Sequence, residues 1–149
     1  MVCSSRMFMR LAGRRHYAPP VLTVVQTDGS FKFSNGSAAV AARITRAGEL
    51  VDEAVSPVYN LASSTEAEWA SIYYGLLLAQ VNRERSIGLE NDCLGVVNSL
   101  LYGSTRSPLS YVSYYRCKIM DTADSMDWCG IRWIPRGQNN ADRLFRRLE

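Results

Sequence analysis

The 149-residue sequence has no apolar run of about 18 residues, the length that a helix needs to cross a membrane, so a transmembrane helix is excluded. Its four cysteines form no Cys-x-x-Cys pair, and His16 is the only histidine that could join them. We therefore expect neither a structural zinc site nor a disulfide framework, and a reducing compartment is the better interpretation. Lysine is also scarce, because 15 of the 17 basic residues are arginine. The planar arginine side chain suits phosphate, but this bias does not require a nucleic-acid partner.

What is present fits one globular domain, because 47% of the residues are hydrophobic and 21% are charged. The net charge of +3 is unevenly placed: four arginines lie in the first 18 residues, whereas the first acidic residue is Asp28. From Pro19 onward, 13 basic and 14 acidic residues nearly balance. We expect an Arg-rich extension over residues 1–18 and one domain over residues 19–149. A loose tail, an arm that touches nucleic acid and a targeting signal remain alternatives for the extension.

Hydrophobic periodicity and turn residues predict an α/β domain with five strands and four helices. A β-branched run is expected to end at a turn formed by residues 28–30, and a meander of three antiparallel strands then gives way to alternating helices and strands. This order indicates a mixed sheet covered by helices. The predicted strands are 21–27, 38–45, 49–58, 86–91 and 130–135, and the predicted helices are 63–83, one that begins at Asp92, 108–125 and 140–149.

Aromatic residues are expected mainly in the core of this domain. The three tryptophans, Trp69, Trp128 and Trp133, are interpreted as core residues. Three tyrosines follow helical spacing in the segment 108–125, where packing in the core or at its rim is favoured over stacking on bases. They are Tyr111, Tyr114 and Tyr115.

Four acidic residues stand where the predicted strands end or the predicted helices begin. Crowded carboxylates repel one another, so such a cluster is usually stabilised by divalent cations. Hard oxygen ligands suit Mg²⁺ or Mn²⁺. Two such ions about 4 Å apart can clamp a phosphodiester, one activating water and the other stabilising the leaving oxygen. The four residues are Asp28, Glu68, Asp92 and Asp142.

The segments around these acids resemble, in order, the four motifs of the ribonuclease H family, type 1. Any one of them alone would be a weak signal, but four in the family's order over residues 21–149 are specific. They read Thr-Asp-Gly-Ser at 27–30, Ser-Ser-Thr-Glu-Ala-Glu-Trp at 63–69, Asn-Asp-Cys-Leu-Gly-Val-Val-Asn-Ser-Leu at 91–100 and Trp-Ile-Pro-Arg-Gly-Gln-Asn-Asn-Ala-Asp-Arg-Leu at 133–144.

The resemblance implies the ribonuclease H fold, a five-stranded mixed sheet with three antiparallel strands, then two parallel strands, flanked by helices. It implies a metal-dependent endoribonuclease that cuts the RNA strand of RNA–DNA hybrids, leaving 5′-phosphate and 3′-hydroxyl ends. Two Mg²⁺ ions, with Mn²⁺ as the alternative, would serve as cofactors. The resemblance carries the catalytic and metal-binding roles onto the four acids named above.

Glu66 competes with Glu68 for the role of metal ligand. Residues two apart on a helix point in nearly opposite directions, so only one of them can face the metals. Both glutamates fit a capping box, in which a serine or threonine precedes the glutamate by three residues, so capping alone does not decide. The family motif places its glutamate directly before an aromatic or aliphatic residue, here Trp69. This implies that Glu68 is the ligand and Glu66 the cap.

The sequence departs from the family pattern around the expected substrate site. The loop before Asp142 lacks the histidine of many members, which predicts slower turnover. Cys93 and Leu94 replace a family serine and glutamine, and a lysine-rich helix is missing, so hybrid recognition is expected to be weaker. Substrate-binding roles are expected, from motif position and side-chain chemistry, for Gly29, Ser30, Ser64, Thr65, Asn98, Arg136 and Asn139.

The alternative to an enzyme is a non-catalytic ribonuclease H-fold protein that binds nucleic acid or serves as a structural part of an assembly. Against it, four acids have no structural reason to lie together. We expect the partner to be an RNA–DNA hybrid, with no membrane and no small-molecule cofactor. We also expect a monomer in the cytoplasm, with organellar targeting by the extension as the alternative.

Overall fold

The computed structural model describes residues 22–32, 34–102 and 110–149. The predicted extension over residues 1–18 and the predicted start of a helix at Pro108 lie outside the described residues. Within this part of the chain, no helix is both long and apolar enough to span a membrane.

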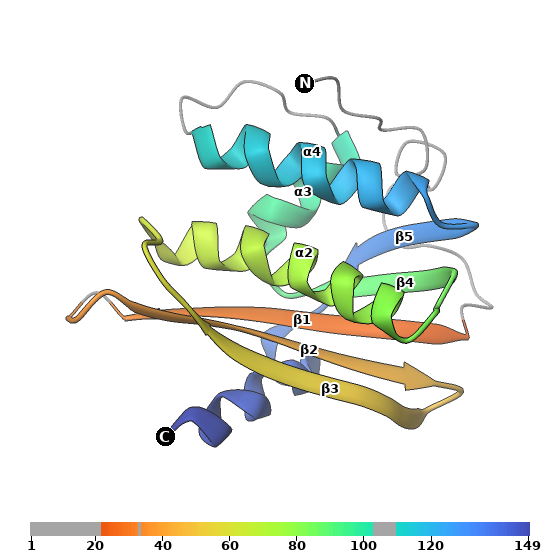
Figure 1. Ribbon diagram of the computed structural model, residues 1–149, viewed down its shortest axis with the longest axis horizontal. Helices are drawn as coiled ribbons and strands as arrows, with labels where there is room; N and C mark the ends of the chain where they lie inside the picture. The colour runs from red at the N-terminus through yellow and green to blue at the C-terminus, as the bar shows by residue number, and fades with distance from the viewer. Residues whose placement is uncertain (1–21, 33, 103–109) are drawn as a thin grey trace.

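A five-stranded sheet forms the centre of the molecule, in the order β3-β2-β1-β4-β5 (Figure 1). The pairs β1–β2 and β2–β3 are antiparallel, whereas β1–β4 and β4–β5 are parallel, so the predicted mixed sheet is confirmed. The strands are β1 (Thr23–Lys32), β2 (Ser37–Arg46), β3 (Glu49–Val58), β4 (Ser86–Asn91) and β5 (Trp128–Trp133).

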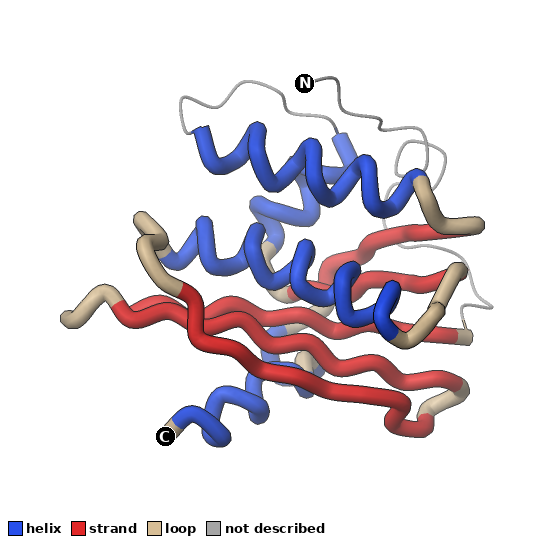
Figure 2. Tube along the Cα trace, in the orientation of Figure 1, coloured by secondary structure: helices blue, strands red, loops and turns tan. Residues whose placement is uncertain are grey.

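Helices cover both faces of the sheet (Figure 2). Three lie on one face, over a core of aliphatic and aromatic side chains that includes Trp69, as predicted. A short 3₁₀ helix crosses the other face, where Ala141 and Leu144 pack on Ala41 of β2. The helices are α2 (Ser64–Val81), α3 (Leu94–Tyr102) and α4 (Ser110–Asp124), and the 3₁₀ helices are η1 (Arg136–Gln138) and η2 (Asn140–Leu148).

The structure corrects the predicted turn at residues 28–30. β1 continues through this segment to Lys32, because Asp28 and Gly29 pair with Ala41 and Val40 of β2. The turn lies further on, where Gly36 adopts a φ of 68° and its amide donates to the Lys32 carbonyl at 2.8 Å. Asp-Gly-Ser is a common turn sequence, but here the ladder with β2 prevails over the local preference.

The last helix also differs from the prediction, because η2 is a 3₁₀ helix rather than an α-helix. Its two buried residues, Ala141 and Leu144, are three positions apart. That spacing fits a 3₁₀ helix, with three residues per turn, as well as an α-helix, with 3.6. The sequence of nine residues therefore cannot distinguish the two kinds of helix.

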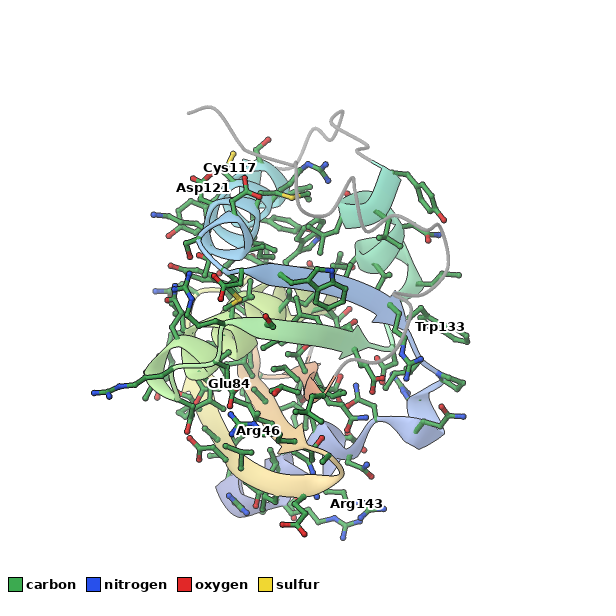
Figure 3. All side chains as sticks on the ribbon, turned by 90° about the vertical axis from the view of Figure 1, so that its right-hand side faces the viewer. Arg46, Glu84, Cys117, Asp121, Trp133 and Arg143 are labelled. Carbon is green, nitrogen blue, oxygen red and sulfur yellow. The ribbon has the colours of Figure 1, made fainter. Side chains whose placement is uncertain are left out.

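The aromatic predictions hold only in part. Trp133 ends the edge strand β5 and is 37% exposed, so its assignment to the core is wrong (Figure 3). Its indole N–H instead donates to the Asp92 carbonyl at 3.0 Å. Trp128 is only half-buried. Tyr111 and Tyr115 pack against the core as expected, whereas Tyr114 is 51% exposed.

Candidate metal centre

Three carboxylates from three different elements meet at one end of the sheet. Asp28 comes from β1, Glu68 from the second turn of α2, and Asp92 from the residue after β4. One oxygen from each lies within 4.8 Å of the others. Asp28 and Glu68 are nearly buried, at 7% and 9% exposed.

Parallel pairing brings Asp28 and Asp92 to the same level. Gln26 of β1 is in register with Glu90 of β4, so the residues two positions later also lie side by side. Asn91 links the end of β4 to β1, because its side-chain amide donates to the Thr27 carbonyl at 3.1 Å and to the Thr27 hydroxyl at 3.0 Å. The two aspartates therefore emerge together where β4 ends.

Gly29 allows α2 to approach β1 closely enough to add Glu68. A Cβ at this position would lie 2.4 Å from the carbonyl carbon and oxygen of Ala67, which are backbone atoms. The Gly29 amide donates to Glu68 Oε1 at 2.7 Å and to Asp28 Oδ1 at 3.0 Å. One backbone N–H thus joins two of the three carboxylates.

The two glutamates of α2 take the separate positions that the sequence analysis expected. The Glu66 amide donates to the Ser63 hydroxyl at 3.1 Å, and Glu66 Oε1 accepts from the Ala62 amide at 2.7 Å. This reciprocal arrangement resembles a capping box, except that the Glu66 carboxylate accepts from the amide of Ala62, the residue before the cap, and not from the amide of Ser63 itself. Glu68 points instead into the carboxylate cluster.

The cluster is electrostatically unfavourable when it holds no cation. Burial, followed by repulsion from Glu68, Asp92 and Asp142, raises the pKa of Asp28 from 3.8 to about 8. Burial, with a contribution from Asp92, raises the pKa of Glu68 from 4.5 to about 7, although the Gly29 amide opposes this shift. A divalent cation would remove both penalties, and three hard carboxylate oxygens are a donor set that fits Mg²⁺ or Mn²⁺.

Asp142 lies beside this group rather than within it. It is exposed at the start of η2, but it lines the same open pocket, of about 530 Å³, as the other three acids. Its charge contributes to the raised pKa of Asp28. The fourth acid is therefore at the rim of the candidate centre.

Five of the seven expected substrate-binding residues line this pocket and two do not. Asn98 is exposed on α3, outside the lining residues. Asn139 is 4% exposed, and its amide donates to the Thr27 carbonyl at 2.9 Å and to Asp92 Oδ2 at 3.4 Å. Its side chain thus positions Asp92 and does not face the pocket. The lining residues are Gly29, Ser30, Ser64, Thr65 and Arg136.

Three further residues line the pocket that were not predicted to bind substrate. They are Phe31, Cys93 and Phe145. The position of Cys93 directly after Asp92 was an available signal for Cys93. Alternation along β1 gave none for Phe31, because it places this residue and Asp28 on opposite faces of the strand. Phe145 reaches the pocket only because η2 crosses the sheet, which no local pattern indicates.

The sheet order and the carboxylate cluster define a protein of the ribonuclease H-like class. The chain belongs to the family described as reverse transcriptase-like, a ribonuclease H-like family whose model matches residues 26–145. A search of the curated proteins found no match.

Three solved structures share this fold. RNase H1 from the halophilic archaeon Halobacterium salinarum NRC-1 has a TM-score of 0.76 and 23% identity, over 82% of this chain and 92% of that chain. The N-terminal RNase H domain of rv2228c from Mycobacterium tuberculosis has a TM-score of 0.74 and 22% identity, over 83% of this chain and 90% of that chain. LC11-RNase H1 in complex with an RNA/DNA hybrid has a TM-score of 0.73 and 18% identity, over 85% of this chain and 99% of that chain.

Proposed function

We propose that this protein is an endoribonuclease that hydrolyses the RNA strand of RNA–DNA hybrids, leaving 5′-phosphate and 3′-hydroxyl ends. One observation carries the proposal: Asp28, Glu68 and Asp92 converge within 4.8 Å in a pocket that Asp142 also lines. The family and the solved hybrid complex of a relative with this fold support the choice of substrate.

The proposed cofactors are two Mg²⁺ ions, with Mn²⁺ as the alternative. Asp28, Glu68 and Asp92 would hold one ion, and Asp142 at the rim would help to hold the second. Held by these carboxylates, the ions would supply Lewis-acid chemistry for activating a water nucleophile and for stabilising charge on the leaving oxygen. Because burial and repulsion raise the pKa values of Asp28 and Glu68, binding of the cation would release protons from these two side chains near neutral pH.

The remaining pocket residues would bind and orient the hybrid. Ser64 and Thr65, exposed at the start of α2, offer hydroxyl groups to phosphate or to the 2′-hydroxyl that distinguishes RNA from DNA. Arg136 lines the pocket and offers a planar guanidinium group to phosphate. Arg136 to Asn140 offer no histidine for proton transfer, so slower turnover than in family members with that histidine stays a prediction. The monomeric state stays a prediction.

The test is cleavage of an end-labelled RNA–DNA hybrid in Mg²⁺ by the wild type and by Asp92→Asn. The matched control is Asp127→Asn, since Asp127 is an exposed aspartate paired with Arg85 outside the pocket. Single-stranded RNA, double-stranded RNA and duplex DNA test the choice of substrate.

We expect wild type and Asp127→Asn to cut the hybrid alone, and Asp92→Asn to lose this activity. Failure of the folded wild type to cut in either Mg²⁺ or Mn²⁺ would contradict the proposal and favour the non-catalytic binding role. Equal cutting of single-stranded RNA would reject the hybrid as the specific substrate.

A further inference from the structure

The loop between β5 and η2 is contacted from β1 by Gln26. This residue lies two positions before Asp28, so the two side chains are on the same face of β1. Its amide N–H donates to the Gln138 carbonyl at 3.1 Å, and its amide oxygen accepts from the Asn140 N–H at 3.0 Å. One side chain thus binds the backbone on both sides of Asn139.

Glu90 determines the orientation of the Gln26 amide. Glu90 is 5% exposed on β4 and accepts from Gln26 Nε2 at 2.9 Å and from the Arg132 Nε at 2.8 Å. An ionised carboxylate can only accept hydrogen bonds, so the Gln26 NH₂ group must face it. The Gln26 oxygen is thereby directed toward the Asn140 N–H.

The loop that Gln26 contacts leads into the first turn of η2, which carries Asp142. Asn139 caps η2, because its side-chain oxygen accepts from the Ala141 amide at 3.1 Å. Asp142 follows in the first turn of η2. Because Asp142 is exposed, its position relative to the other three acids depends on where the backbone of this turn lies.

We propose that Gln26 is a positioning residue for Asp142, an inference that rests on the proposed function of the metal centre. Without the Gln26 amide, the Gln138 carbonyl and the Asn140 N–H are no longer hydrogen-bonded to β1. The packing on Ala41 and the bond from the Asn139 amide to the Thr27 carbonyl remain, so η2 stays on the sheet but its first turn is held less firmly. Asp142 then presents its carboxylate to the second ion less often. Removal of the groups that orient metal ligands typically lowers metal affinity by about 10- to 100-fold.

The test replaces Gln26 by methionine, which keeps the length of the side chain and removes both hydrogen-bonding groups. Gln80→Met, the same change at an exposed position on α2 outside the pocket, is the control. We expect Gln26→Met to raise the Mg²⁺ concentration for half-maximal hybrid cleavage about tenfold or more, with little change in kcat at saturating Mg²⁺. An unchanged Mg²⁺ requirement overturns the inference.

Exchanging the two partners tests the hydrogen-bond pattern itself. Gln26→Glu places two carboxylates together and should raise the Mg²⁺ requirement at least as much as Gln26→Met. Adding Glu90→Gln restores a donor and an acceptor between the two positions and keeps an acceptor for the Asn140 N–H. The double variant should recover part of the loss, and a double variant no better than Gln26→Glu contradicts the proposed pattern.

Two further readouts do not depend on activity. They are amide hydrogen exchange at Asn140 and calorimetric binding of Mn²⁺ to the full chain, each compared between wild type and Gln26→Met. Faster exchange with weaker Mn²⁺ binding supports the positioning role, even where the wild type cuts no hybrid and the proposed activity is therefore wrong. Unchanged exchange and Mn²⁺ binding in a protein that does cut hybrid reject the positioning role and leave the proposed activity intact.

Discussion

At the scale of single residues, Gly29 sets the distance between β1 and α2. Gly29→Ala would place a methyl group 2.4 Å from the backbone of Ala67, and neither backbone can yield without moving its whole element. We expect a loss of about 2–3 kcal/mol in the free energy of unfolding, a size typical of overpacking in a close contact. Urea unfolding of both proteins measures this loss.

Gly95→Ala is the matched control for this prediction. Gly95 lies in α3, and a Cβ there meets nothing within 4 Å. Alanine is favoured over glycine inside a helix by about 1 kcal/mol, so this variant should equal or exceed the wild type in stability. If Gly29→Ala is as stable as Gly95→Ala, the close approach of α2 to β1 is not as described.

Asp28 is expected to make stability depend on pH in the absence of divalent ions. Because burial and neighbouring carboxylates raise its pKa from 3.8 to about 8, the folded protein keeps a proton there that the unfolded chain has lost. The contribution of Asp28 to the free energy of unfolding therefore falls as pH rises between about 4 and 8. Glu68, with a pKa of about 7, acts in the same direction.

Asp28→Asn removes this penalty, so its melting temperature in EDTA should exceed that of the wild type by about 3 °C or more near pH 8. The advantage should shrink as the pH is lowered toward about 4, where residue 28 is uncharged in both folded proteins. Mg²⁺ should raise the melting temperature of the wild type but not of Asp28→Asn. Melting curves of both proteins at several pH values test this prediction. A difference in melting temperature that grows toward low pH would contradict it.

At the scale of elements, the start of α2 depends on the capping box at Ser63. The Ser63 hydroxyl satisfies the Glu66 amide, which would otherwise lack a partner in the first turn. Ser63→Ala should lower the free energy of unfolding by about 1 kcal/mol, which chemical denaturation would measure. Ser64→Ala, one residue later and exposed, should change it far less, and equal losses in the two variants would argue against the cap.

The cap also bears on the site, because Glu68 is two residues after Glu66. Fraying of the first turn would loosen Glu68 from the Gly29 amide, 39 residues away in sequence. The capping residues at the start of the helix therefore help to hold Glu68 in the candidate metal centre.

At the scale of the whole molecule, positive charge is concentrated in residues 1–18, which carry four arginines and no acid. Deleting this segment should weaken hybrid binding and flatten its dependence on salt, by roughly 0.9 in the logarithmic slope for each phosphate that is no longer neutralised. Binding measured across a salt series gives this slope. Replacing the four arginines by glutamine in the full chain separates charge from length, and an unchanged slope in both variants rejects a role for the extension.

The order of elements and the positions of the four acids could be predicted from the sequence. Strands at 49–58 and 86–91 agree with β3 and β4, because short segments bounded by turn residues are local signals. The motif around Trp69 separated Glu68 from Glu66, and the structure places them accordingly. The turn at 28–30 and the burial of Trp133 were predicted wrongly, because strand pairing and sheet edges depend on distant partners.

Local pattern and motif were enough to select the four acids as candidates, since Asp28, Glu68, Asp92 and Asp142 can each be found without any coordinates. How those four differ became visible only in the folded chain: three are gathered within 4.8 Å, two of them have raised pKa values, and Asp142 remains at the rim. The same holds for the hydrogen bond between Gln26 and Asn140, which are 114 residues apart. Burial, repulsion and hydrogen bonding depend on distances that the chain acquires only when β1, α2, β4 and η2 pack together.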